Sequence, residues 1–190
     1  CTNTTAINYD PLDNTDYGSC IGIGSSYQGG IIFYIDETGE HGLVAALEDV
    51  TEGSNMGIYG TPEGFEWGCY GSYVSGADGQ AIGTGYQNTL DISAQNCQTQ
   101  QGGITAAQAA LNYETEGYTD WFLPSINELE EMYNTIGNGG SEGNIGGFES
   151  ETSDTPYYWS SSGYDSYDAW LGHFSSGGPT STYTVRALRC

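Results

Sequence analysis

Apolar residues in this sequence come in short blocks, and glycine-rich polar stretches separate them. The chain has 190 residues, among them 30 glycines and 16 tyrosines. Glycine is common in tight turns, and tyrosine is common in strands. No segment approaches the roughly 18 consecutive apolar residues that a membrane-spanning helix needs. The pattern therefore predicts a loop-rich α+β fold rather than a helical bundle or a membrane protein.

Strand patterns occur near both ends of the main part of the chain. The stretch "GIIFYIDETGEHGLVAAL" predicts a hairpin, in which Gly39 can supply a turn residue with positive φ. Three later stretches, separated by turn residues, predict a small antiparallel sheet. The predicted strands span residues 31–35 and 41–47 for the hairpin, and 157–162, 168–174 and 182–190 for the sheet.

Two helices are predicted between these strand regions. Residues 104–114 have apolar residues at helical spacing, and residues 124–137 show a stronger pattern. In the second, Ser125 and Glu128 form an S-x-x-E capping box, and Gly137 lies where a helix commonly ends. The "YTDWFLP" stretch before it predicts a short buried strand, whereas residues 48–103 show little regular structure.

The charge balance is strongly acidic. The chain has 25 acidic residues, two arginines and no lysine, for a formal net charge of −23. Such a surface repels phosphate backbones and anionic membranes, so we expect neither nucleic-acid binding nor membrane insertion. Arg186 and Arg189, both in the last predicted strand, are expected to pair with carboxylates.

The five cysteines form no C-x-x-C pair and indicate an oxidising compartment. A bond between Cys1 and Cys20 would close a loop worth about 3 kcal/mol on the chain-entropy model. Cys69 and Cys97 lie in the long irregular region and are its natural covalent tie. Cys190 is then left over, which suggests an intermolecular bond. If Cys1 is instead a lipid attachment point, the first bond cannot form.

Several phrases occur together in one order: "GGIIFYIDETGEHGLVAA", "WGCYGSYVSGADGQAIGTGYQNTLDI", "YTDWFLPSINELEEMYNTIG", "YYWSSS", "AWLGHFSSG" and "VRALR". Over about residues 29–189 the chain resembles the C-terminal domain of bacterial collagen-like adhesins, the Lcl C-terminal-domain-like family. That family is similar to C-type lectin folds. The resemblance implies extracellular display and adhesion or ligand binding, without implying one reaction.

The first twenty residues, "CTNTTAINYDPLDNTDYGSC", resemble a short cysteine-bracketed repeat of bacterial surface proteins. Ile7 stands where that repeat often carries another cysteine. We therefore divide the chain into a repeat segment at 1–22, a joint at 23–28 and a C-type-lectin-like domain at 29–190. Asn3, in the sequon Asn3-Thr4-Thr5, is a candidate glycan site on the first segment.

Calcium is the candidate metal, because it prefers clustered carboxylate and carbonyl oxygens. Asp10, Asp13 and Asp16 recur every three residues in a loop-like stretch. The same residues equally suit turns, in which aspartates bond to their own backbone. The sugar-binding E-P-N and W-N-D phrases of calcium-dependent lectins are missing. Further acids flank "YYWSSS": Glu149, Glu151, Asp154, Asp165 and Asp168.

Aromatic residues are the second resource for binding. Tyrosine and tryptophan stack on sugars and anchor protein interfaces. Tyr164, Tyr167, Trp159 and Trp170 are the candidate contact residues, with the first two in the "GYDSYD" turn. Tyr157, Tyr158 and Tyr183 lie in the same predicted sheet, where strand alternation places some of these rings in the core.

Catalytic chemistry has weaker candidates. His41 and His173 are the histidines of the chain, and Ser160 to Ser162 are the most concentrated serines. No G-x-S-x-G elbow is present. We therefore expect a non-catalytic extracellular module that binds copies of itself or other surface proteins, with head-to-tail packing into a filament. The alternatives are a calcium-assisted carbohydrate-binding lectin and, with less support, a secreted hydrolase.

Overall fold

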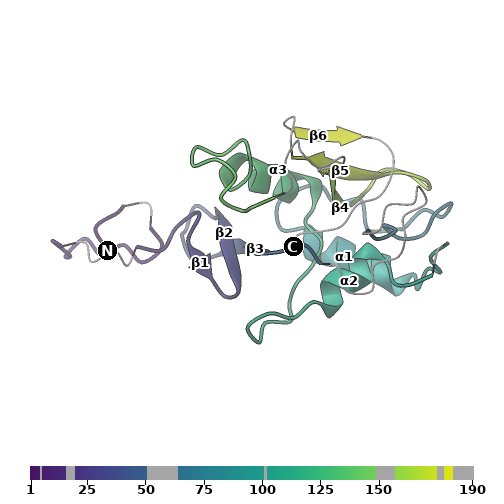
Figure 1. Ribbon diagram of the computed structural model, residues 1–190, viewed down its shortest axis with the longest axis horizontal. Helices are drawn as coiled ribbons and strands as arrows, with labels where there is room; N and C mark the ends of the chain where they lie inside the picture. The colour runs from purple at the N-terminus through teal and green to yellow at the C-terminus, as the bar shows by residue number, and fades with distance from the viewer. Residues whose placement is uncertain are drawn as a thin grey trace.

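A computed structural model describes residues 1–4, 6–15, 20–50, 64–100, 102–148 and 157–174, together with the backbone of 178–181 (Figure 1). Within these ranges the chain forms three helices and two three-stranded antiparallel sheets. This content is compatible with the predicted α+β class. Among the described residues, no helix is long and apolar enough to cross a membrane.

The first sheet contains the predicted hairpin. β2 (Gly30–Ile35) pairs antiparallel with β3 (Gly42–Ala46), and Gly39 in the connecting turn has a φ of +72°. β1 (Ser26–Tyr27) adds a third strand beside β2. β1 falls within the stretch 23–28, which the sequence analysis describes as a joint, and the division of the chain into segments stays a prediction.

The second sheet has the order β4-β5-β6. β4 (Tyr157–Gly163) and β5 (Ala169–His173) correspond to the first two predicted strands. β6 (Gly178–Ser181) pairs with β5. The third predicted strand, 182–190, lies outside the described residues.

The two predicted helices are present. α2 (Ala106–Asn112) and α3 (Ile126–Thr135) each begin with a capping box, and the one on α3 joins Ser125 and Glu128 as predicted. The structure corrects the picture of residues 48–103 as largely irregular, because α1 (Gly85–Ala94) lies within them. α1 packs against α2 and β4, while α3 packs against β2 and the second sheet (Figure 1).

The "YTDWFLP" stretch joins neither of the two sheets, which corrects the predicted buried strand. Its backbone is instead held by the neighbouring elements. The Leu123 N–H donates to Oγ1 of Thr89 on α1, and the Pro124 carbonyl accepts from the Ser161 N–H on β4. Trp121 and Leu123 are buried, so the stretch still contributes to the core.

A layer of buried polar side chains joins β4 to the helices. Ser160, Ser161 and Ser162 are fully buried, as is nearly all of Asn88 on α1. Asn88 Nδ2 donates to the Gly79 carbonyl over 2.6 Å, and Ser162 Oγ donates to the same carbonyl over 2.6 Å. These bonds fix the loop before α1 against the second sheet.

The described residues before β1, namely 1–4, 6–15 and 20–22, lie in a small segment that projects from one end of the long axis in Figure 1. The disulfide Cys1–Cys20 closes it, with Cα atoms 5.0 Å apart. The second disulfide joins Cys69 and Cys97. Both predicted pairings are therefore present in the structure. Such bonds are typical of secreted and cell-surface proteins.

Candidate interaction surface

Two aromatic pairs lie in and beside the 164–170 segment, and their four residues, Tyr70, Tyr164, Tyr167 and Trp170, are here called the tyrosine surface. Tyr70 packs edge-to-face on Tyr167, with ring centroids 5.5 Å apart. Tyr164 packs in the same manner on Trp170, at 5.3 Å. The three tyrosines are 58–67% exposed. Large exposed aromatic rings held by one another are typical of interface anchors, because little rotational freedom is lost on binding.

The loops that carry these rings are tied to each other and to the body. Tyr70 directly follows Cys69, which is bonded to Cys97. The Gly71 N–H donates to the Ser166 carbonyl over 2.8 Å and so joins the two tyrosine-bearing loops. Oδ1 of Asp165 accepts the N–H groups of Tyr167 and Asp168 at 2.7 and 2.9 Å. The surface is therefore preorganised by covalent and hydrogen-bond ties.

Trp170 lies partly under this surface. Its side chain is half-buried, and its Nε1 is buried without a hydrogen-bond partner among the described residues. Trp159 lies deeper, only 6% exposed, and its Nε1 donates to the Phe65 carbonyl over 3.0 Å. A direct contact role for Trp159 does not fit this burial, because its ring is part of the core.

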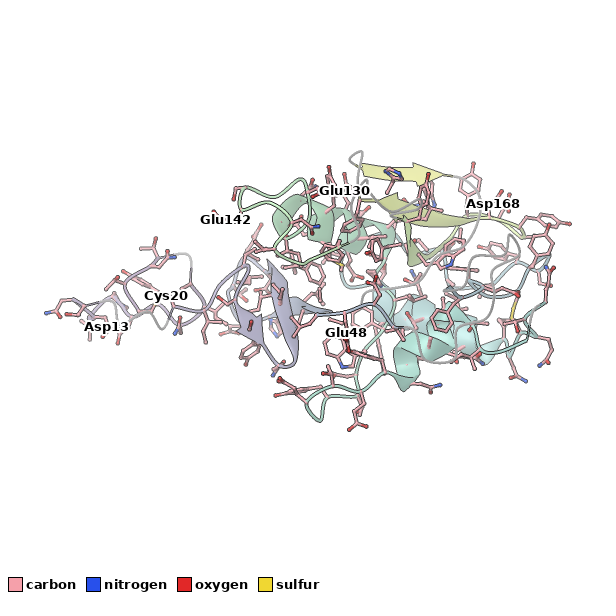
Figure 2. The ribbon with its side chains drawn as sticks, viewed as in Figure 1. Asp13, Cys20, Glu48, Glu130, Glu142 and Asp168 are labelled. Atoms are coloured by element: carbon pink, nitrogen blue, oxygen red, sulfur yellow. A yellow bond between two sulfur atoms is a disulfide. The ribbon has the colours of Figure 1, made fainter. Side chains whose placement is uncertain are left out.

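The tyrosine surface and the disulfide-closed segment lie at opposite ends of the molecule. Figure 2 labels Asp168, beside Tyr167 in sequence, at one end of the long axis, and Asp13 and Cys20 at the other. The N-terminal segment also exposes apolar side chains, with Leu12 90% exposed. Each end therefore exposes large apolar or aromatic side chains.

The aspartates proposed for calcium take part in turns. Oδ1 of Asp10 accepts the Leu12 N–H over 2.9 Å, and Asp13 pairs with the Cys1 backbone nitrogen. Asp16 lies outside the described residues. In the parts of the chain that the structure describes, no three His, Cys, Asp or Glu side chains come together to hold a metal ion. Calcium binding stays a prediction, and turn chemistry accounts for Asp10. The Asn3 side chain is exposed.

The serines and His173, the candidate catalytic residues, make hydrogen bonds or ring contacts within the fold. Ser160, Ser161 and Ser162 donate their hydroxyls to the backbone carbonyls of Trp170, Pro124 and Gly79. His173 packs on Tyr157, with ring centroids 4.5 Å apart.

The other candidate base, His41, is exposed, and its Nδ1 lies 3.2 Å from Oδ2 of Asp36. The hydrogen bond from Thr38, followed by contacts with His41, lowers the pKa of Asp36, while partial desolvation opposes this shift. Asp36 and His41 therefore interact across the turn that connects β2 to β3.

Glu128 is a buried acid that sequence reasoning assigned only to a capping box. Its side chain is fully buried, and its oxygens accept the N–H groups of Gly83 and Ser125, each over 2.6 Å. Desolvation raises the pKa of Glu128, and the backbone hydrogen bonds partly oppose this effect. The side chain therefore joins the loop before α1 to the start of α3.

A comparison with protein-family models gives no match, and a comparison with curated protein sequences gives none either.

Several predicted residues lie outside the described part of the chain. The predicted residues outside the described ranges are Glu149, Glu151, Asp154, Tyr183, Arg186, Arg189 and Cys190.

Proposed function

We propose that this protein is an extracellular, non-catalytic interaction module of a bacterial surface protein, with a C-type-lectin-like main domain. The observation that carries the proposal is the preorganised tyrosine surface, at the opposite end of the molecule from the disulfide-closed segment. The buried, carbonyl-bonded serines support a non-catalytic role. The two disulfides support exposure to an oxidising compartment.

The partner is a second copy of the chain, bound head-to-tail. The N-terminal segment of one copy, with exposed Leu12 and Tyr9, contacts Tyr70 and Tyr167 of the next. Such a heterologous contact generates an open filament if the rotation that relates one copy to the next does not close a ring. Both ends are acidic, so repulsion opposes assembly at low salt. Screening shortens the Debye length to about 10 Å at 0.1 M salt, and assembly therefore strengthens with ionic strength.

Light scattering over a concentration series, in low and high salt and with or without calcium, tests this function. The wild-type protein should gain mass with concentration, most strongly at high salt. Replacing Tyr70 and Tyr167 by serine should weaken assembly by more than tenfold, because buried aromatic anchors each contribute about 2 kcal/mol or more. Tyr27→Ser removes an exposed tyrosine on β1 and serves as the control. A wild-type protein that stays monomeric throughout would refute self-assembly.

Calcium-assisted carbohydrate binding is the second candidate. Tyr73 lies in the same loop as Tyr70, is exposed, and its hydroxyl lies 3.4 Å from Oδ2 of Asp78. Exposed rings beside carboxylates suit sugars, which stack on aromatic faces and donate hydroxyl hydrogen bonds. A glycan array with and without a chelator separates the candidates, since only the lectin function gives chelator-sensitive signals.

A further inference from the structure

A cavity of about 160 Å³ lies between β3, the 118–124 stretch and α3, away from the tyrosine surface. Four aromatic residues line it: Phe33, Tyr118, Trp121 and Phe122. A cavity of about 150 Å³ is large enough for a benzene-sized ligand. The size therefore suits a small organic group rather than a folded partner.

Two tight turns lie beside the cavity: Gln28 of the first lines it, and Tyr118, which follows the second, lines it as well. Gln28 and Gly29, between β1 and β2, both have positive φ, as do Glu116 and Gly117. This combination is typical of two-residue hairpin turns. Gly29 packs against Thr115, so the two turns support each other: a Cβ added at Gly29 would lie 3.0 Å from Thr115 Cγ2. A rigid rim lowers the entropic cost of binding.

Two acidic residues, Asp120 and Glu128, line the cavity. Asp120 is exposed at the lining, and no basic residue is among the described residues that line the cavity. Glu128 also lines it, but its oxygens accept backbone N–H groups, as described above. Asp120 is therefore the carboxylate available to a ligand. Aromatic rings together with a carboxylate attract organic cations, because both present negative potential.

We propose that this cavity binds an alkylammonium group, that is, a positively charged nitrogen carried on methyl or methylene carbons. The aromatic walls hold the carbons and attract the charge, and Asp120 pairs with it. The group belongs to a small free amine or to a lysine side chain of another protein, since this chain has no lysine. This inference is independent of the proposed self-association, which uses the other end of the molecule.

Calorimetric titration of the whole chain with choline is the first test. Saturable binding at about millimolar affinity is expected, and the neutral isostere, with carbon in place of the quaternary nitrogen, should not saturate. A lysine-containing peptide and a trimethyl-lysine peptide form further arms. Tighter binding of a peptide than of choline assigns the site to a protein partner, and the reverse assigns it to a small amine.

Two variants and a matched control locate the binding. Asp120→Asn and Phe122→Leu should each weaken choline binding by about five- to tenfold. Glu142→Gln removes the same charge from an exposed loop elsewhere (Figure 2) and should leave binding unchanged. Urea unfolding verifies that each variant is folded. Absence of saturation, equal binding of the neutral isostere, or equal loss in Asp120→Asn and Glu142→Gln would overturn the proposal.

Discussion

Replacing Glu128 by alanine should destabilise the fold far more than replacing any exposed acid. The Ser125 N–H is buried and would lose its acceptor, at a cost of about 1–3 kcal/mol. Loss of one buried methylene group adds about 0.8 kcal/mol. The Gly83 N–H can be hydrated instead, because Gly83 is exposed. The expected decrease in the free energy of unfolding is therefore about 2–4 kcal/mol.

Urea unfolding at neutral pH, with the disulfides intact, measures this decrease. Glu130→Ala, on the exposed face of the same helix, is the matched control (Figure 2) and should change stability by no more than about 0.5 kcal/mol. The decrease in unfolding free energy for Glu128→Gln should lie between those of the two alanine variants. The amide of the glutamine keeps one acceptor but turns a donor towards a backbone N–H. If Glu128→Ala costs less than about 1 kcal/mol, or no more than Glu130→Ala, the reasoning is wrong.

The same side chain predicts a pH dependence. Desolvation raises the pKa of Glu128 in the folded state above its ordinary value of 4.5, so the folded state holds this proton to higher pH. The stability that this group contributes is thus largest below pH 4.5 and is lost as the pH rises through the raised pKa. The difference in unfolding free energy between wild type and Glu128→Gln should fall over that window. A constant difference would contradict the raised pKa.

Three further predictions concern other contacts. Gly85→Ala should destabilise the protein by about 1–3 kcal/mol, because the new Cβ would lie 2.2 Å from Oε2 of Glu128; a thermal melt that matches wild type would contradict this close approach. Ser125→Ala should cost about 1 kcal/mol through loss of the helix cap, measured by urea unfolding, and an unchanged midpoint would contradict the capping geometry. Replacing Cys69 and Cys97 by serine should cost about 3.5 kcal/mol on the chain-entropy model. That double variant should also weaken concentration-dependent assembly, because Tyr70 follows Cys69; light scattering that equals wild type would show that the tie does not organise the tyrosine surface.

Short-range patterns predicted the elements whose signals are local. The hairpin of β2 and β3 follows from two apolar runs around a turn with Gly39, and α3 follows from its capping box and helical spacing. α1 was missed because its buried face includes Asn88 and Thr89 beside Ile92, so its apolar periodicity is weak. Its polar residues are buried because partners from distant segments satisfy them, and a local pattern does not contain those partners.

The features of the candidate site also fall into those that local sequence predicts and those that depend on tertiary packing. Residue types and their spacing were enough to predict the strong negative charge, both disulfide pairings and Tyr164 and Tyr167 as contact candidates. That Tyr70 packs on Tyr167 and that Trp159 lies in the core follow only from the packing of distant segments. The aromatic cavity beside Asp120 likewise exists only in the folded chain, because its walls come from separate elements. Turns, caps and charge depend on neighbouring residues, whereas surfaces and cavities depend on which distant segments pack together.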